Sequence, residues 1–229
     1  MIFEESKCSV EMKVANFSKY VRRQNIARFL VQSELFKRQL NVKGSIVECG
    51  VHHGGGVMTW AKLSSTLEPY NYHRRVVGFD TFDGFPSVTA EDTKRHPNVK
   101  VGMFSEGYDV YGELNSCIQE YDANRFLGEV KKIELVKGDA NITIPKYIED
   151  NPHFLVSLLY LDFDIMDPTR TAIQNFLPRM PKGAIIAFDE LNNPDWPGET
   201  LAFLETMNVR HHELNCFEYE PNISYIKLC

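Results

Sequence analysis

Two apolar runs of this chain end in acidic side chains whose spacing could hold a metal ion. The run LVSLLYLDFD ends with Asp162 and Asp164, and the run GAIIAFDE ends with Asp189 and Glu190. Apolar runs of this length between turn residues predict buried strands of a parallel sheet, so both pairs are expected at the same carboxyl edge. Carboxylates that converge there repel one another unless a cation lies between them, and oxygen ligands suit Mg²⁺, Mn²⁺ or Ca²⁺. The pattern predicts a divalent metal site, with helix caps or solvated loop acids as the alternative.

A glycine-rich segment, ECGVHHGGG at 48–56, follows another apolar run. Glycines at such a place let the backbone approach a ligand closely. The spacing is not the GxGxxG of dinucleotide-binding enzymes, and Glu48 before Gly50 would be unfavourable beside a pyrophosphate. A carboxylate there would suit an ammonium group, such as that of S-adenosylmethionine (SAM). Asp80 ends the next apolar run, within reach of a ribose diol. The segment favours a nucleoside-type cofactor over a simple tight turn.

A third candidate site follows the apolar run at 132–136. Its sequence is Gly-Asp-Ala, with Asp139 in the middle. If SAM is the cofactor, Asp139 and the neighbouring backbone would contact the adenine. Asp139 or Asn141 could also cap the helix that follows, and the two interpretations are compatible.

The elements that must position these residues alternate between strand and helix. Strands are expected near 45–51, 75–79, 132–136, 154–161 and 184–188, and two closing strands near 210–218 and 224–228. Helical spacing is expected over 14–40, 58–67, 109–127, 142–149, 168–177 and 198–207. This alternation predicts an α/β fold, Rossmann-like and doubly wound, with a mostly parallel sheet. Because only a short Pro-Asn link joins the last two strands, they should form an antiparallel hairpin.

Two segments outside this alternation bear on function. The segment 81–107 has little periodicity, and a loop of this length in a compact domain is usually functional or mobile. The helical segment near the N-terminus carries Arg22, Arg23 and Arg28. It is expected to pack on the sheet, and it could also cover the active site or form a dimer interface.

Composition narrows the class of protein. With 229 residues we expect one domain, and a net charge of −6 argues against a nucleic-acid partner. No segment has the length or character of a membrane helix or a signal peptide, so we expect no membrane partner and a cytoplasmic location. An odd number of scattered cysteines without metal-ligand spacing favours reduced thiols. These cysteines are Cys8, Cys49, Cys117, Cys216 and Cys229.

Four segments together resemble the macrocin O-methyltransferase family. They are GSIVECGVHHGGG, VVGFDTFDGFP, VKGDANITIP and LYLDFDIMDPTRTAIQNFLPRMPKGAIIAFDE, and they span roughly residues 44–200. The resemblance implies a metal-dependent O-methyltransferase that uses SAM and acts on a sugar hydroxyl of a natural product or polysaccharide precursor. It implies the class I methyltransferase sheet over 44–229, after an N-terminal helical extension at 1–43. The expected partners are a small sugar or glycoside acceptor and a second copy of the chain, in a homodimer or higher homo-oligomer.

The resemblance also implies roles for individual residues. Those expected at SAM are Glu48, Gly50, Val51, His52, Gly54, Gly55, Asp80, Thr81, Phe82, Asp139, Ala140 and Asp162. Those expected at Mg²⁺ or Mn²⁺ are Asp162, Asp189, Glu190 and Asp164. Strand alternation leaves open whether Asp164 ligates, because the chain can already be turning at that position.

Three departures from the family pattern change these expectations. His52 and His53 stand where the family commonly has an aromatic and a basic residue, and Glu190 stands where it usually has Asp. The family also tends to place a histidine base before the helix that precedes the third strand, and 105–110 contains none. The candidates for a substitute base are Tyr108, Asp109 and His96.

Other functions remain open from the sequence. A DxD sequence after an apolar run also occurs in metal-dependent nucleotide-sugar glycosyltransferases. It occurs too in phosphatases with the pattern DxDx[TV], but Met166 stands where these need Thr or Val. A non-catalytic binding protein on the same fold is the third alternative, because the expected histidine base is missing.

Overall fold

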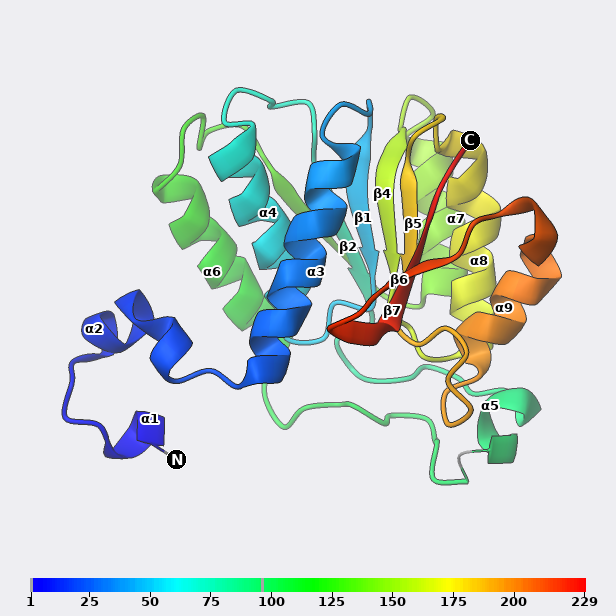
Figure 1. Ribbon diagram of the computed structural model, residues 1–229, viewed down its shortest axis with the longest axis horizontal. Coiled ribbons are helices and arrows are strands. Elements are labelled where there is room, and N and C mark those ends of the chain that lie inside the picture. Colours follow the sequence, from blue (N-terminus) through cyan, green and yellow to red (C-terminus); the bar gives the residue numbers. More distant parts are fainter. Residues whose placement is uncertain (1, 96) are drawn as a thin grey trace.

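The computed structural model describes residues 2–95 and 97–229, and its centre is one seven-stranded sheet (Figure 1). The strand order is β3-β2-β1-β4-β5-β7-β6. The strands are β1 (Ser45–Cys49), β2 (Val76–Asp80), β3 (Ile133–Lys137), β4 (Val156–Leu161), β5 (Ile185–Phe188), β6 (Asn215–Phe217) and β7 (Glu220–Lys227). The first five strands are parallel, whereas β7 pairs antiparallel with both β5 and β6. The predicted doubly wound sheet with an antiparallel closing hairpin is confirmed.

Helices cover both faces of the sheet because each strand carries apolar side chains on both sides. On one face α3 (Arg23–Gln39), α4 (Gly55–Leu67) and α6 (Val110–Ala123) bury residues such as Leu35, Trp60 and Ile118. On the other face α7 (Ala140–Asp150), α8 (Met166–Phe176) and α9 (Gly198–Thr206) bury residues such as Ile144 and Phe176. The sheet is therefore the middle of three layers, and its carboxyl edge is where loops can form a site.

The helical segment predicted over 14–40 is divided into separate helices in the structure. The region contains α2 (Val10–Ala15), a 3-10 turn (Phe17–Lys19) and then α3, which packs against α4, β4 and β7. A short α1 (Ile2–Glu5) and α2 lie to one side of the α/β body (Figure 1). The first predicted closing strand, 210–218, is also shorter in the structure, because a 3-10 turn at Val209–His211 occupies its beginning. The division of the chain at residue 43 stays a prediction.

The segment 81–107 has more structure than its sequence suggested. It contains α5 (Ala90–Arg95) and runs along the carboxyl edge of the sheet (Figure 1). The buried carboxylate of Asp92 accepts hydrogen bonds from the backbone N–H of Met166 and from Thr89. Phe85 and Val99 pack with Ile165 in a small apolar cluster of their own. These contacts dock the segment on the beginning of α8.

In the part of the chain that the structure describes, no helix combines the length and apolar character needed to cross a membrane.

Candidate active site

The register of two neighbouring strands brings the predicted acids together. β4 and β5 are parallel, with Leu161 opposite Phe188, so Asp162 and Asp189 follow at equivalent positions. The backbone N–H of Asp189 donates to the carbonyl of Leu161 at 2.9 Å, which fixes this alignment. The predicted convergence of the two strand ends at one edge is confirmed.

A cation from the N-terminal region lies between these two carboxylates. The guanidinium of Arg28, on α3, contacts Asp162 Oδ2 at 2.5 Å, Asp189 Oδ1 at 2.9 Å and Asp189 Oδ2 at 3.1 Å. The Tyr160 hydroxyl donates to Asp189 Oδ1 at 2.5 Å from inside the sheet. Arginine keeps its charge in proteins, so Arg28 offsets part of the repulsion between the two acids. The sequence singled out Arg28 only as one of three N-terminal arginines.

Further acids surround this pair, and we call Asp162, Asp164, Asp189, Glu190 and Glu199 the acid cluster. Burial and the charge of Asp189 raise the pKa of Asp164 to about 7. The same two causes raise the pKa of Asp162 well above its ordinary value, and burial followed by the charges of Asp162 and Asp189 does so for Glu199. Glu199 accepts the backbone N–H of Glu190 at 3.0 Å through Oε2, whereas its Oε1 is buried without a hydrogen-bond partner among the described residues.

The acid cluster has the chemistry of a divalent metal site, but its spacing is that of carboxylates around a guanidinium. It has five acidic side chains around one guanidinium, the raised pKa values of Asp162, Asp164 and Glu199 reflect burial and mutual repulsion, and its donors are all oxygens, as Mg²⁺ and Mn²⁺ prefer. The carboxylate oxygens of the acid cluster are farther apart than the ligands of one bound ion. Among the described residues, three potential ligand atoms lie within 4.8 Å of one another only in a group at His52, His53 and Glu106, which is described below. Donor type and charge thus fit a divalent ion, provided that Arg28 moves.

The glycine-rich segment forms the turn between β1 and α4, directly beside the acids. Gly50 has φ +91° and lies so close to Asp162 that a Cβ would come within 1.9 Å of its carbonyl oxygen. Gly54, with φ +82°, is the N-cap of α4. Glu48 is buried beneath this helix, and a Cβ on Gly56 would lie 2.2 Å from its carboxylate. Glycine at 50 and 56 is therefore required by close packing around two acids of the site.

Asp80 holds this turn in place. Its Oδ2 accepts the backbone N–H groups of Val51 at 2.7 Å and His52 at 2.8 Å, and its Oδ1 accepts that of Phe82 at 2.7 Å. These bonds join the ends of β1 and β2. The sequence predicted Asp80 at a ribose, and the structure adds a positioning role that the motif alone did not show. Asp139 similarly caps α7, because its Oδ1 accepts the N–H of Asn141 at 2.9 Å.

A pocket at the carboxyl edge unites most of the predicted cofactor residues. Those that line it are Gly50, His52, Asp80, Thr81, Phe82, Asp139, Ala140 and Asp162. Glu48, Val51, Gly54 and Gly55 are not among its lining residues. Asp164 and two side chains of the docked loop, Phe104 and Glu106, complete part of the wall. Trp196 packs on Phe85 and Phe104 beside this wall. The glycine turn, the acids and the loop thus face one space.

The candidate bases occupy different places. Asp109 is the N-cap of α6 and accepts the N–H of Gly112 at 2.9 Å. The hydroxyl of Tyr108 lies 3.0 Å from His53 Nδ1, and partial burial and Glu113 raise its pKa. His96 lies outside the described residues. Neither contact marks Tyr108 or Asp109 as a base, so the base stays a prediction.

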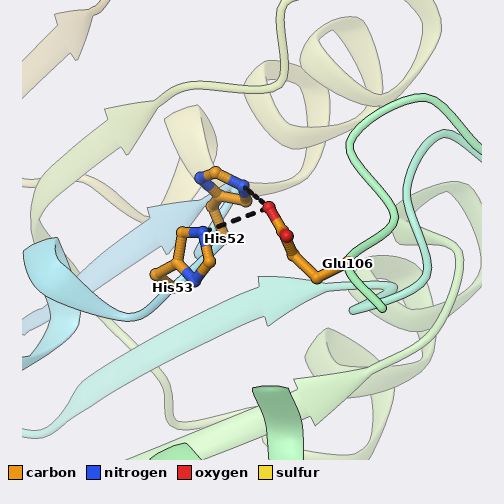
Figure 2. A group of neighbouring side chains, drawn as sticks. All are labelled: His52, His53 and Glu106. Atoms are coloured by element: carbon orange, nitrogen blue, oxygen red, sulfur yellow. Dashed lines mark ion pairs between the residues drawn. The ribbon is translucent and has the colours of Figure 1, made fainter. Parts of the chain in front are cut away.

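Sequence reasoning missed a second cluster at the pocket, formed by His52, His53 and Glu106, which we call the histidine cluster (Figure 2). Both imidazoles face Oε1 of Glu106, with Nε2 at 3.4 Å for His52 and 3.2 Å for His53. The two rings are 4.1 Å apart between centroids. The histidine pair was visible in the sequence as a departure from the family pattern, but nothing there pointed to Glu106.

Comparisons with known proteins agree with this geometry. The macrocin O-methyltransferase (TylF) family profile matches residues 22–206. Mycinamicin III 3''-O-methyltransferase of Micromonospora griseorubida is 23% identical over 171 residues, which is 74% of this chain. This chain spans 63% of the length of that relative.

Solved structures give the same assignment. A crystal structure of the calicheamicin methyltransferase CalS11 superposes with a TM-score of 0.94 at 34% identity, over 99% of this chain and 88% of that one. An apo structure of CalS11, described as a TDP-rhamnose 3'-O-methyltransferase, gives 0.85 at 32% identity, over 99% and 89%. The O-methyltransferase NovP shares the fold, with a TM-score of 0.68 at 20% identity, over 89% and 80%. The chain belongs to the macrocin O-methyltransferase family.

Proposed function

We propose that this protein is a SAM-dependent O-methyltransferase that methylates a hydroxyl of a sugar in a natural product or polysaccharide precursor. The family and its relatives are O-methyltransferases, and the relatives' names specify mycinamicin III and TDP-rhamnose as substrates. The observation that carries the proposal is the shared pocket. Gly50, Asp80 and Asp139 line it together with Asp162 and Asp164, so a nucleoside cofactor and a polar acceptor would meet there.

The reaction is an in-line displacement. The acceptor oxygen attacks the methyl carbon of the sulfonium, the carbon–sulfur bond breaks with its electron pair going to sulfur, and the hydroxyl proton passes to a base. Holding the two reactants in such a geometry can supply about 7–11 kcal/mol. In our proposal the turn at Gly50 and the backbone at Asp139 hold the cofactor in the pocket. Glu48 is buried behind the glycine turn and outside the pocket lining, and it would take the ammonium group if the turn opens toward it. The contact of Phe85 and Val99 with Ile165 at the beginning of α8 would help to exclude water from the reacting atoms.

We also propose that the acid cluster binds Mg²⁺ or Mn²⁺ through Asp162, Asp189 and Glu190, with Asp164 as a further candidate. The number of carboxyl groups around the single Arg28 guanidinium supports a cation there, as does Glu199 Oε1, which has no hydrogen-bond partner in the described part of the chain. When bound, such an ion makes an acceptor hydroxyl more acidic. Arg28 would hold the two aspartates in register until the ion arrives and then withdraw with its flexible side chain, which is 42% exposed.

Binding and product formation test the function separately. We expect calorimetry to show S-adenosylhomocysteine (SAH) binding at one site per chain. Incubation of SAM with TDP-rhamnose and a panel of other nucleotide sugars and glycosides should yield a product heavier by one methylene. A glycosyltransferase would bind nucleotide sugar without affinity for SAH. A non-catalytic binding protein would bind SAH but form no methylated product with any member of the panel.

The remaining proposals concern assembly and location. Exposed apolar side chains on the segment outside the α/β body, including Val10, Met12, Val14 and Phe17, support a homo-oligomer. Light scattering of the full chain and of Val14→Lys would test it, because a charge at an interface should lower the measured mass. All five cysteines are free, which is consistent with the proposed cytoplasmic location.

A further inference from the structure

We propose that the histidine cluster is a second metal site, which binds Zn²⁺ or a related divalent transition ion through His52, His53 and Glu106. It is separate from the acid cluster in donor chemistry. Two imidazole nitrogens and one carboxylate oxygen suit Zn²⁺, Co²⁺ or Ni²⁺, whereas Mg²⁺ prefers oxygen ligands.

The distances in the cluster match those between the ligands of a tetrahedral ion. Zn²⁺ lies about 2.0–2.2 Å from nitrogen and oxygen ligands, which places neighbouring ligand atoms about 3.3 Å apart. Nε2 of His52 and Nε2 of His53 lie 3.4 Å and 3.2 Å from Glu106 Oε1. The two imidazole ligand atoms are within 4.8 Å of each other, and both side chains are about half exposed, so small rotations can close the third edge.

A second observation concerns the far side of one imidazole. Nδ1 of His53 lies 3.0 Å from the Tyr108 hydroxyl, while Nε2 of the same ring faces Glu106. Histidines that ligate metals commonly donate their other ring N–H to a fixed partner, which sets the tautomer and the orientation of the ring. Tyr108 is therefore a positioning residue for this site. The rings of His53 and Tyr108 are nearly parallel, at 22°, with their centroids 6.3 Å apart.

The backbone also presents the two histidines together. His52 has φ +48°, a left-handed conformation that is uncommon for a residue other than glycine, and Asp80 holds its N–H at 2.8 Å. Consecutive residues would otherwise point to different sides of an extended chain. The turn instead directs both rings to one carboxylate, as Figure 2 shows.

The site would act at the rim of the pocket. His52 and Glu106 both line it, and three protein ligands leave the fourth position of a tetrahedral ion open. That position would take an oxygen of the acceptor, a phosphate or a hydroxyl. Only the binding of an acceptor oxygen at the open position rests on the proposed function. Metal binding itself can be measured in the absence of SAM and acceptor.

Zn²⁺ titration of the full chain tests the site. Protein freed of metal by a chelator and then dialysed is titrated by calorimetry with excess Mg²⁺ present, so that Zn²⁺ competes poorly for the acid cluster. We expect the wild type to bind one more Zn²⁺ per chain than His52→Ala/His53→Ala, or to bind it at least tenfold more tightly. His211→Ala/His212→Ala removes the chain's other consecutive histidine pair, which lies near the 3-10 turn at Val209–His211, and should bind like the wild type.

Two conservative variants keep the test decisive if the alanine pair folds poorly. Glu106→Gln keeps the shape but removes the charged ligand, and it should weaken Zn²⁺ binding at least tenfold. Tyr108→Phe should weaken it about 10- to 100-fold, as expected for a partner of a ligating histidine. Co²⁺ in place of Zn²⁺ should give a ligand-field spectrum that Glu106→Gln loses. The proposal is overturned if the wild type binds no Zn²⁺, if the cluster variants change affinity less than tenfold, or if the His211/His212 control loses as much.

Discussion

The acid cluster and the histidine cluster border the same pocket, but they differ in burial and in charge. Burial raises the pKa of Asp162 and Asp164, and Arg28 already supplies one positive charge to the acid cluster. The histidine cluster is exposed, and it contains a single carboxylate between two imidazoles that can both bind it when protonated. A cation in the acid cluster would reduce the repulsion between its carboxylates. A metal ion in the histidine cluster would instead replace the contacts between the imidazoles and Glu106 with metal–ligand bonds.

The two clusters also differ in what holds them in place. The register of β4 and β5 positions Asp162 and Asp189, and sheet register is fixed by many buried contacts. The histidine cluster joins the turn after β1 to the loop before α6, and the hydrogen bonds of Asp80 and Tyr108 supply its order. We therefore expect changes in the acid cluster to alter catalysis strongly and changes in the histidine cluster to alter metal binding first.

Removal of all metal should have the largest effect. If the acid cluster holds the ion that acidifies the acceptor, turnover in excess EDTA should fall to background, and Mg²⁺ or Mn²⁺ should restore it after dialysis. Zn²⁺ alone should not restore it, because its preferred nitrogen ligands lie in the other cluster. Methyl transfer from labelled SAM measures this directly. Full activity in EDTA would show that methyl transfer needs no metal ion. The acid cluster would then differ from the histidine cluster in burial and charge but not in a catalytic role.

Replacement of one acid should come next. Asp189→Ala should lower kcat about 100- to 1,000-fold, the range for losing one preorganised electrostatic group. Its SAH affinity should change little, because Asp189 is not among the residues that line the pocket. Asp150→Ala, which removes an exposed carboxylate paired with Lys146, serves as the control and should retain wild-type kinetics. An Asp189→Ala enzyme with normal kcat would show that the acid cluster is structural.

The same contrast explains what the sequence could predict. Apolar runs identified the strands, and their expected parallel order was enough to place Asp162 and Asp189 at one edge, as the register of β4 and β5 confirms. Glycine at 50 was predicted to allow close approach of a ligand, which stays a prediction, and the structure adds a close approach to the backbone of Asp162. These features depend on the pattern of apolar and glycine residues and on the regular geometry of a parallel sheet, so they can be predicted from the sequence.

The missed features depend on contacts between distant segments. Arg28 meets Asp162 across 134 positions, and no periodicity in α3 selects that arginine over its neighbours. Glu106 lies in an irregular loop whose path follows from the docking of Asp92 and Phe85. Glu199 lies in the first turn of α9, where acidic residues are common, so the sequence did not single it out. Only the packed structure shows that it is fully buried beside the other acids.

Loss of the internal cation should have a moderate effect that depends on metal. Arg28→Ala should lower the free energy of unfolding in EDTA by about 1–3 kcal/mol, between the values for exposed and buried ion pairs. Added Mg²⁺ should narrow the difference, because it offsets the same carboxylates. Urea unfolding with and without Mg²⁺ measures both quantities. The control is Arg23→Ala, which removes an exposed arginine from the same helix. If Arg28→Ala lowers the free energy of unfolding equally with and without Mg²⁺, Arg28 and the metal ion do not interact with the same carboxylates.

The smallest expected effect concerns the pH dependence of cofactor binding. Burial raises the pKa of Glu48 to about 8, so this carboxyl is mostly protonated at pH 7 in the cofactor-free protein. An ammonium group prefers the ionised form, and SAH affinity should therefore rise with pH up to about 8 and then level off, by at most tenfold per pH unit. Calorimetry across pH measures the rise, and Glu48→Gln should flatten it.

This titration also separates the two clusters. The charge of Glu48 contributes to the raised pKa of Asp162, and Arg28 favours the ionised form of Glu48. Mg²⁺ in the acid cluster should act as Arg28 does and shift the SAH profile to lower pH by less than one unit. Zn²⁺ in the histidine cluster should leave the profile in place, since none of its ligands is among the groups that shift the pKa of Glu48. A shift produced by Zn²⁺ in Glu106→Gln as well as in the wild type would place that ion among the acids instead.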